Sequence, residues 1–372
     1  MKNNKAIAIG FSFAGSILGA GYLSGQELLQ FFGVFGIWGI IGLVVTLLLL
    51  VFLASCVMEI ANTSSIMEMD KIIIPWNQRI LRSIVSFLEI FFFLATVVIM
   101  LAGGGSLINE LFNLPVWTGS LIMTILVVVF AYFGISGAMK IFSLLVPIMA
   151  VVTLAFSIAT ISKFGFPFVP ESQGGENPLL NNWIISAITF TAYNFFSAIG
   201  MLAPMGAIAN SKKSIYGGSV FGAGVLMIIA LSVILAIFAC PQSVSSDLPM
   251  LFIAREISPV LSYIYGIILL FGMFGCSLYS IVAVLVFLQS KSEKLKKFKP
   301  AFLVGVAVVC YPLSLFGFGD LISVIYPLTG YLSVIFIACM VYHFVIVKRK
   351  NKLKAKKKDD CLIDNAKEKE AN

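Results

Sequence analysis

The first long apolar segment of the chain contains the stretch GSILGAGYLSG, residues 15–25, with four glycines and two serines in eleven residues. Glycine costs about 1 kcal/mol relative to alanine inside a helix, so this stretch predicts a helix break near Gly19–Gly21. In hydrocarbon, a break is tolerated only where the freed backbone faces protein or a wet cavity. The Gly15/Gly19 and Gly21/Gly25 pairs also have the GxxxG spacing of a helix-packing seam, which is the alternative interpretation.

The composition is that of an integral membrane protein. Of 372 residues, 60% are hydrophobic and 11% are charged, whereas soluble domains are about half apolar and a quarter charged. Apolar runs of roughly 18 residues or more, each able to cross a hydrocarbon layer of about 30 Å, recur along the chain. We expect one all-α domain, residues 1–347, with ten transmembrane helices near 6–34, 36–60, 83–108, 115–135, 139–161, 183–209, 214–240, 258–289, 301–317 and 320–347.

The basic residues predict the orientation of these helices. If the N-terminus is cytoplasmic, all but two of the 25 lysines and arginines lie in cytoplasmic segments, and only Lys163 and Arg255 lie outside. This distribution obeys the positive-inside rule. It predicts a plasma-membrane protein with both termini in the cytoplasm and with cytoplasmic segments at 1–5, 61–82, 136–140, 210–213, 290–300 and 348–372.

The net charge of +8 does not indicate nucleic-acid binding, because the basic residues fall in short loops and in the tail 348–372. Basic clusters beside membrane helices set orientation and contact anionic lipid headgroups. The tail is too polar to pack, so we expect it to be a disordered cytoplasmic segment. The six cysteines form no CxxC pair or Cys/His cluster, so no cofactor, disulfide framework or zinc site is expected. No obligatory protein partner is evident.

The spacing of the spans indicates an inverted repeat. Spans six to ten begin roughly 180 residues after spans one to five, and an odd number of helices per half inserts the halves, about 6–161 and 183–347, with opposite topology. Folds of this kind bind substrate near the midplane, where each half contributes a broken first helix. In the second half, YNFFSAIG at 193–200 is followed by Pro204 and Gly206, which predicts a break in span six. Ten evenly spaced helices would mimic the spacing, so the breaks are the stronger evidence.

The sequence AGSILGAG, residues 14–21, resembles the broken first helix of the amino acid–polyamine–organocation superfamily, whose members have the LeuT-type fold. The longer stretch GAGYLSGQE, residues 19–27, is most similar to the YkvI-type membrane proteins. The general likeness covers about residues 5–347, whereas the specific motif covers only residues 14–27. The resemblance implies a 5+5 inverted repeat with helices 1 and 6 broken.

The break has a chemistry of its own. The outer half of a broken helix exposes backbone N–H groups at a positive dipole end, which suits a carboxylate, and the inner half exposes carbonyls, which suit a small cation. The resemblance places sodium between the carbonyls of Gly15 and Leu18 and the hydroxyls of Ser277 and Ser280, which share a helix face. Membrane serines also commonly bond the carbonyl four residues earlier, and that alternative stays open. The resemblance places substrate against Gly19, Ala20, Gly21, Tyr22, Tyr193, Asn194 and Ser197.

Three acidic residues lie within the expected spans. Glu27 follows the break in span one, and intramembrane carboxylates are costly and therefore functional candidates. We expect gating or proton coupling by Glu27, with a structural hydrogen bond as the alternative. Glu89, within reach of Arg82, is expected to be structural, and Glu59 to be interfacial. Some proton-coupled members of the superfamily have a lysine inside helix five, but this chain has Lys140 only at the cytoplasmic start, which leaves sodium or a carboxylate as the coupling element.

These features favour a secondary active transporter that couples Na⁺ or H⁺ to symport of a small amphipathic solute such as an amino acid. A transporter-fold receptor that binds the solute without moving it would keep every one of these features. An intramembrane enzyme is disfavoured because the chain lacks HExxH, an Asp pair and a plausibly placed Ser/His combination. A channel would more naturally show a repeated pore loop or a charged ring.

Overall fold

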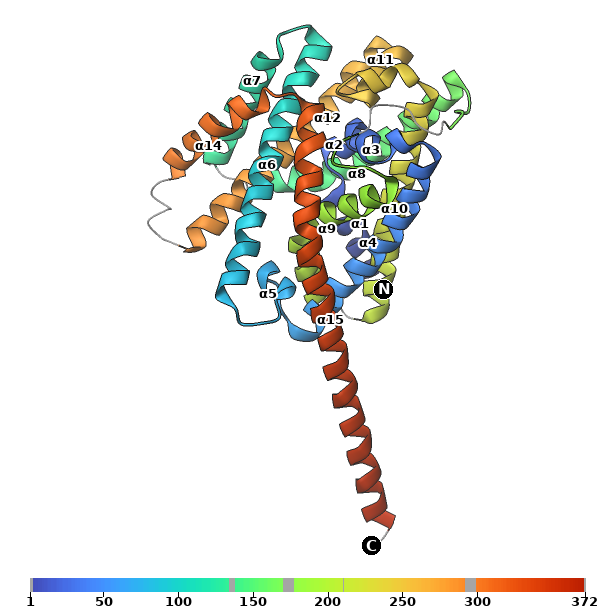
Figure 1. The fold of residues 1–372 in the computed structure, drawn as a ribbon, viewed down its shortest axis with the longest axis vertical. Coiled ribbons are helices and arrows are strands. Elements are labelled where there is room, and N and C mark those ends of the chain that lie inside the picture. The colour runs from blue at the N-terminus through green and yellow to red at the C-terminus, as the bar shows by residue number, and fades with distance from the viewer. Residues whose placement is uncertain (1–2, 134–137, 170–176, 210, 292–298, 371–372) are drawn as a thin grey trace.

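The computed structural model describes residues 3–133, 138–169, 177–209, 211–291 and 299–370, and every regular element within these ranges is a helix (Figure 1). Short stretches of the expected cytoplasmic segments 1–5, 136–140, 210–213, 290–300 and 348–372 lie outside the described residues. The first half holds α1 (Asn3–Ile17), α2 (Ala20–Ser24), α3 (Gln26–Phe31), η1 (Gly33–Phe35), α4 (Ile37–Ser64), α5 (Met69–Ile73), α6 (Arg79–Phe112), α7 (Val116–Phe133) and α8 (Ala138–Phe164). The second half holds α9 (Trp183–Ala207), α10 (Lys212–Ala239), η2 (Pro241–Ser245), α11 (Pro249–Ile257), α12 (Pro259–Lys291), α14 (Lys299–Ser314) and α15 (Phe318–Glu370).

The helices have the length and composition of membrane spans. In the described chain, seven are long and apolar enough to cross a membrane, in α4, α6, α8, α9, α10, α12 and α15. Shorter apolar helices, Ala6–Ile17, Val116–Tyr132 and Lys299–Ser314, fall on three further expected spans. Large apolar side chains such as Leu48, Phe130 and Val286 are exposed on the outside, as expected for helices that face lipid. The protein is an all-α membrane protein, as predicted, while the number of ten crossings stays a prediction.

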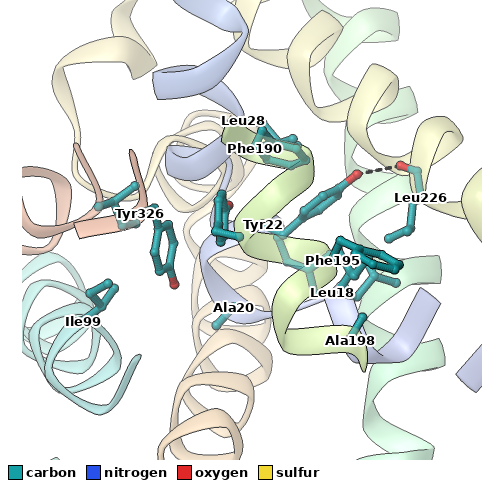
Figure 2. Close-up of a cluster of buried hydrophobic side chains, with 14 of the residues drawn as sticks. Leu18, Ala20, Tyr22, Leu28, Ile99, Phe190, Phe195, Ala198, Leu226 and Tyr326 are labelled. Atoms are coloured by element: carbon teal, nitrogen blue, oxygen red, sulfur yellow. Dashed lines mark hydrogen bonds between the residues drawn. The ribbon is translucent and has the colours of Figure 1, made fainter. Parts of the chain in front are cut away.

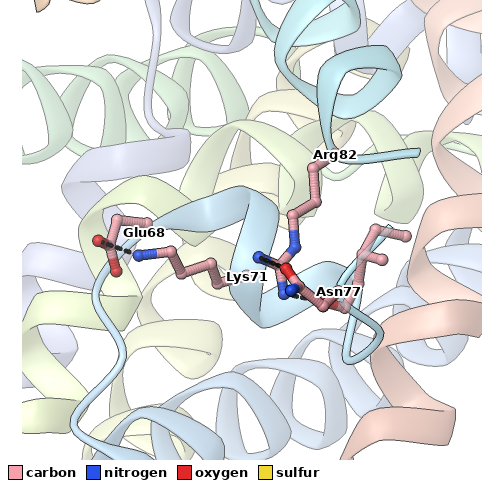
Figure 3. Close-up of polar contacts among 5 residues, drawn as sticks. Glu68, Lys71, Asn77 and Arg82 are labelled. Carbon is pink, nitrogen blue, oxygen red and sulfur yellow. Dashed lines mark hydrogen bonds and ion pairs between the residues drawn. The ribbon is translucent and has the colours of Figure 1, made fainter. Parts of the chain in front are cut away.

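Polar contacts gather around the α5–α6 connection at one end of the bundle. Figure 1 shows α5 and the C-terminal extension toward one end, and α11 with the α6–α7 connection toward the other. At the α5 end, Lys71 pairs with Glu68 at 2.7 Å, and Arg82 donates to Asn77 Oδ1 at 3.4 Å (Figure 3). The hydrogen bond from Lys71 lowers the pKa of Glu68. Arg82 therefore turns back to the α5–α6 loop, and the described residues show no ion pair between Arg82 and Glu89.

The predicted orientation is tested by cysteine accessibility. Lys213, at the start of α10, and Ser245, in η2, are both exposed. In a background without native cysteines, Lys213→Cys is expected to react with a membrane-impermeant reagent only after the cells are opened, and Ser245→Cys in intact cells. Labelling of both positions from the same side would contradict the inverted-repeat topology.

Span one is broken, as the glycine-rich stretch predicts. α1 ends at Ile17, α2 begins at Ala20, and a second interruption at Gly25 separates α2 from α3. Gly21 lies inside α2 rather than at a break. Glycines with GxxxG spacing pack α10 against α1: a Cβ at Gly218 would lie 3.1 Å from Ala6 O, and one at Gly222 would lie 2.6 Å from Gly10 O.

Span six is not broken, so that part of the prediction is wrong. α9 runs without interruption from Trp183 to Ala207, with Pro204 in its last turn. The polar side chains that suggested a break instead bond to their own helix. Asn194 Nδ2 donates to Phe190 O at 3.2 Å, and Ser197 Oγ donates to Asn194 O at 2.8 Å. Local bonds of this kind satisfy a polar residue without opening the backbone.

The C-terminal tail also departs from the prediction. We expected a disordered segment at 348–372, but α15 continues as one helix to Glu370 and projects away from the bundle (Figure 1). Residues 348–370 contain no glycine or proline, and nine of these 23 residues are lysine, a good helix former. Helix propensity therefore accounts for the continuation of α15 beyond the predicted span.

Candidate functional site

Two interruptions isolate α2 in the middle of the protein. Gly19 has an extended backbone, with φ −95° and ψ 173°, and its N–H bonds to Ile17 O at 2.7 Å instead of continuing α1. Gly25 has φ +85°, a left-handed conformation that favours glycine. All five residues of α2 are buried. Helix α2 is therefore a short helical segment between two bends, and protein surrounds it.

Glu27 ties span one to span six. Its side chain is 4% exposed, the Tyr193 hydroxyl donates to its Oε1, and Asn194 Nδ2 donates to the same oxygen at 3.3 Å. The other carboxyl oxygen lies over α2, since a Cβ at Gly21 would be 3.0 Å from Oε2. The absence of a side chain at Gly21 therefore makes room for the carboxylate. The structure thus brings Gly21, Tyr193 and Asn194 together around Glu27.

Among the described residues, the Glu27 carboxyl forms no ion pair with a basic side chain. The ion pairs among the described residues are Lys71–Glu68 and Lys212–Glu59, both away from this site. A buried carboxylate without a cation is costly in a low-dielectric interior, and binding of a proton or a cation relieves that cost. Glu27 is therefore placed to take up a proton, a metal cation or an ammonium group.

An aromatic wall stands beside the Glu27–Tyr193 bond. The Tyr326 ring of α15 stacks on the Tyr193 ring, with centroids 4.6 Å apart and an interplanar angle of 15°. The Phe31 ring also contacts Tyr193, with ring centroids 5.5 Å apart. Figure 2 shows Tyr326 beside Ile99 of α6 and on the other side of α2 from Leu226. The site thus combines one carboxyl group with large apolar and aromatic surfaces.

Tyr22 does not join this group. Its hydroxyl donates to Leu226 O of α10 at 2.8 Å, and its ring lies near Phe190 (Figure 2). This bond anchors α2 to α10. Ser197 is likewise committed, since its hydroxyl bonds to the Asn194 carbonyl. The structure therefore places the hydroxyls of Tyr22 and Ser197, both predicted substrate contacts, in hydrogen bonds to backbone carbonyls of α10 and α9.

Helix α12 approaches the break at Gly19 through Gly272 and Cys276 rather than through the predicted Ser277. A Cβ at Gly19 would lie 3.8 Å from Cys276 Sγ, and one at Gly272 would lie 3.4 Å from Ala20 Cβ. Ser277 Oγ donates to Met273 O at 3.0 Å, the local bond that was the alternative interpretation. Ser280 is buried and lies four residues after Cys276, so it occupies the same face one turn further along. Geometry therefore favours Ser280 over Ser277 as a hydroxyl near the inner end of the break.

The backbone around the break also differs from the predicted arrangement of one inner and one outer half-helix. Leu18 N still bonds to Ala14 O at 2.9 Å, so α1 keeps its helical bonding to the edge of the break, and Gly15 lies inside α1. The outer half of span one is not one helix but two short ones, α2 and α3, separated at Gly25. A helix dipole sums over aligned peptides, so one turn supplies less of it than the uninterrupted outer helix that we expected.

Some residues of the site had no signal in the sequence. Tyr326 and Cys276 reach the site only through the packing of α15 and α12 against span one. Gln26, next to Glu27, is 6% exposed, and within the described part of the chain its Oε1 has no hydrogen-bond partner. A Cβ at Gly319 would lie 2.7 Å from Gln26 Nε2 and 2.9 Å from Asp247 Oδ1, so α15, span one and the η2–α11 segment meet here. A glutamine in a membrane segment was the one available hint.

The fold is that of LeuT-type transporters. The chain aligns with the inward-facing conformation of Mhp1 with a TM-score of 0.61 and 13% identity, covering 93% of this chain and 77% of that one. It aligns with MhsT in complex with L-phenylalanine with a TM-score of 0.61 and 15% identity, covering 89% and 88%. A manganese transporter of Eremococcus coleocola aligns with a TM-score of 0.54 and 15% identity, covering 90% and 85%.

The sequence is similar over nearly its whole length to two proteins of Bacillus subtilis (strain 168). The membrane protein YkvI is 26% identical over 346 residues, which cover 91% of this chain and 97% of that protein. The protein YyaD is 27% identical over 350 residues, which cover 90% and 96%. No protein-family model matches the chain. The resemblance to YkvI-type membrane proteins is confirmed, and the structural neighbours are transporters rather than enzymes.

Proposed function

We propose that this protein is a secondary active transporter of the plasma membrane, with both termini in the cytoplasm, that couples the movement of H⁺ or Na⁺ to symport of a small amphipathic solute. The observation that carries the proposal is the Glu27 carboxyl, buried beside a broken helix and bonded to Tyr193 and Asn194 of span six. A group that joins the first helices of the two halves is where a change in ligand or protonation would act on both. This supports alternating access between the halves.

The lining of the site supports an amphipathic solute. Glu27 offers a polar anchor, while the stacked rings of Tyr193 and Tyr326 offer an apolar surface. An amino acid has both the ammonium group and the apolar side chain that such a site would bind. In this proposal Gly19, Ala20 and Gly21 contribute backbone to the same site.

The structural neighbours are in keeping with this solute class. MhsT was solved with L-phenylalanine. Mhp1, a nucleobase-cation-symport-1 family transporter, was solved with bromovinylhydantoin bound, and that structure aligns with this chain with a TM-score of 0.55 and 14% identity. The cargo of the manganese transporter is not carried over. The residues that the structure describes bring no three His, Cys, Asp or Glu side chains together, so a divalent metal would lack a ready set of ligands.

Two coupling sites compete within the proposal. Glu27 would couple a proton, whereas carbonyls of Gly15 and Leu18 with the Ser280 hydroxyl would couple sodium. We favour Glu27, because its carboxyl is buried and, among the described residues, forms no ion pair with a basic side chain.

Uptake by the purified protein in proteoliposomes tests the function. With a panel of labelled amino acids and an imposed proton or sodium gradient, we expect accumulation of at least one solute under one of the two gradients. Saturable binding of a solute with no accumulation under either gradient would favour the receptor alternative.

A further inference from the structure

A groove on the lipid-facing surface runs between α4, α10 and α15, away from the break in span one. Its volume is about 560 Å³. Leu48, Phe52 and Val220 line it and are 65%, 48% and 57% exposed. Around a membrane protein these side chains meet hydrocarbon rather than water, so acyl chains are what lies against them.

The groove stays open along α10 because of its sequence. Tyr216, Val220 and Gly224 follow one another at four-residue intervals and line the groove from one helix face. Gly224 leaves space, since a Cβ there would meet nothing within 4 Å. The eight helical steps from Tyr216 to Gly224 rise about 12 Å, most of the hydrocarbon depth of one leaflet.

One end of the groove carries a positive charge. Lys348 of α15 lines this end, with its ammonium 4.6 Å from the centroid of the Phe344 ring. The neighbouring carboxylate, Glu59, is already bonded to Lys212 and, at 2.9 Å, to the Tyr216 hydroxyl. Among the described residues Lys348 forms no ion pair of its own. The end that carries Lys348 is the predicted cytoplasmic face.

We propose that this groove is a binding site for an anionic phospholipid of the cytoplasmic leaflet, with an acyl chain along Leu48, Val220 and Gly224 and the phosphate at Lys348. Lipid tails are as apolar as leucine, so the chain gains packing contacts but no hydrophobic driving force. The headgroup therefore sets the preference. One lysine near the surface favours an anionic lipid by about fivefold. The bound lipid would hold α15 against α4 and α10, whatever solute the protein carries.

Native mass spectrometry of the full chain, purified in detergent and supplied with phosphatidylglycerol or phosphatidylcholine of the same chain length, tests this site. We expect one retained phosphatidylglycerol, preferred about fivefold over phosphatidylcholine. Gly224→Trp fills the groove and is expected to lose the lipid. Gly305→Trp on α14 is the matched control, because a Cβ at Gly305 also meets nothing within 4 Å, and it is expected to retain the lipid.

A second pair of variants separates the chain site from the charge. Lys348→Gln is expected to remove the preference for phosphatidylglycerol while a lipid still binds, and Val220→Trp fills the groove if Gly224→Trp does not purify. Inorganic phosphate is expected not to displace the lipid. The proposal is overturned if either tryptophan in the groove leaves lipid retention equal to that of Gly305→Trp, if Lys348→Gln keeps the preference, or if phosphate alone competes.

Discussion

Glu27→Gln is expected to abolish accumulation of solute driven by a proton gradient while leaving membrane insertion intact. The amide keeps hydrogen-bonding atoms for Tyr193 and Asn194, but it cannot bind and release a proton. Loss of a charge-assisted hydrogen bond of about 2 kcal/mol would also weaken the binding of a solute's ammonium group at this position by roughly thirtyfold. Initial uptake rates in proteoliposomes, measured separately under proton and sodium gradients, check this expectation.

Glu89→Gln is the matched control for this substitution. Glu89 is another glutamate within a membrane helix, in α6, and it is away from the Tyr193 bond. Uptake by Glu89→Gln is expected to match the wild type under both gradients. Full sodium-driven accumulation by Glu27→Gln, with no pH dependence, would remove Glu27 from the coupling mechanism and leave Gly15, Leu18 and Ser280 as the coupling site.

Substitution of Gly21 is expected to have a comparably large effect. A Cβ at Gly21 would lie 3.0 Å from Glu27 Oε2, so Gly21→Ala must displace the carboxyl and Gly21→Leu must displace it much further. We expect roughly tenfold slower uptake for the alanine variant, equivalent to the loss of one hydrogen bond of about 1.4 kcal/mol, and no uptake for the leucine variant. Gly19→Ala is expected to lose less of the uptake rate than Gly21→Ala, because a Cβ at Gly19 would make only ordinary van der Waals contacts.

Gly200→Ala provides the control for the glycine series. Gly200 lies in α9, within the same pair of spans, and a Cβ there would meet nothing within 4 Å. Its uptake is expected to stay near that of the wild type. If Gly21→Leu inserts correctly and transports like Gly200→Ala, then the space above Gly21 is not part of the site.

The positions of the membrane helices could be predicted because hydropathy alone defines them. The break at Gly19 could also be predicted, because four glycines in eleven residues weaken any helix there. The left-handed Gly25 could not be singled out, because the sequence does not show which of the four glycines takes a positive φ. Asn194 and Ser197 misled the prediction for span six, because each bonds to a carbonyl of α9 and the helix continues past both.

The candidate site was predictable only where its residues neighbour the break. Glu27 could be predicted because a carboxylate within a membrane span is costly and is therefore a functional candidate. Its contact with Tyr193 joins spans one and six, which the inverted repeat had already paired. Tyr326 and Cys276 were not found, because their places depend on how α15 and α12 pack against α2. Ser277 and Ser280 were predicted together from the resemblance and their shared helix face, and for Ser277 the structure shows the local bond to Met273 O that had been the alternative.

The measurement that tests the central claim most directly is the dependence of retained solute on vesicle volume. Proteoliposomes of two diameters, with equal protein content and an imposed proton or sodium gradient, are loaded with the labelled solute that the uptake panel identifies. Transport predicts that retained label rises with internal volume, exceeds the external concentration, and falls to equality when an ionophore collapses the gradient. Label that stays proportional to the amount of protein, independent of volume and unaffected by the ionophore, would contradict transport and identify the protein as a receptor.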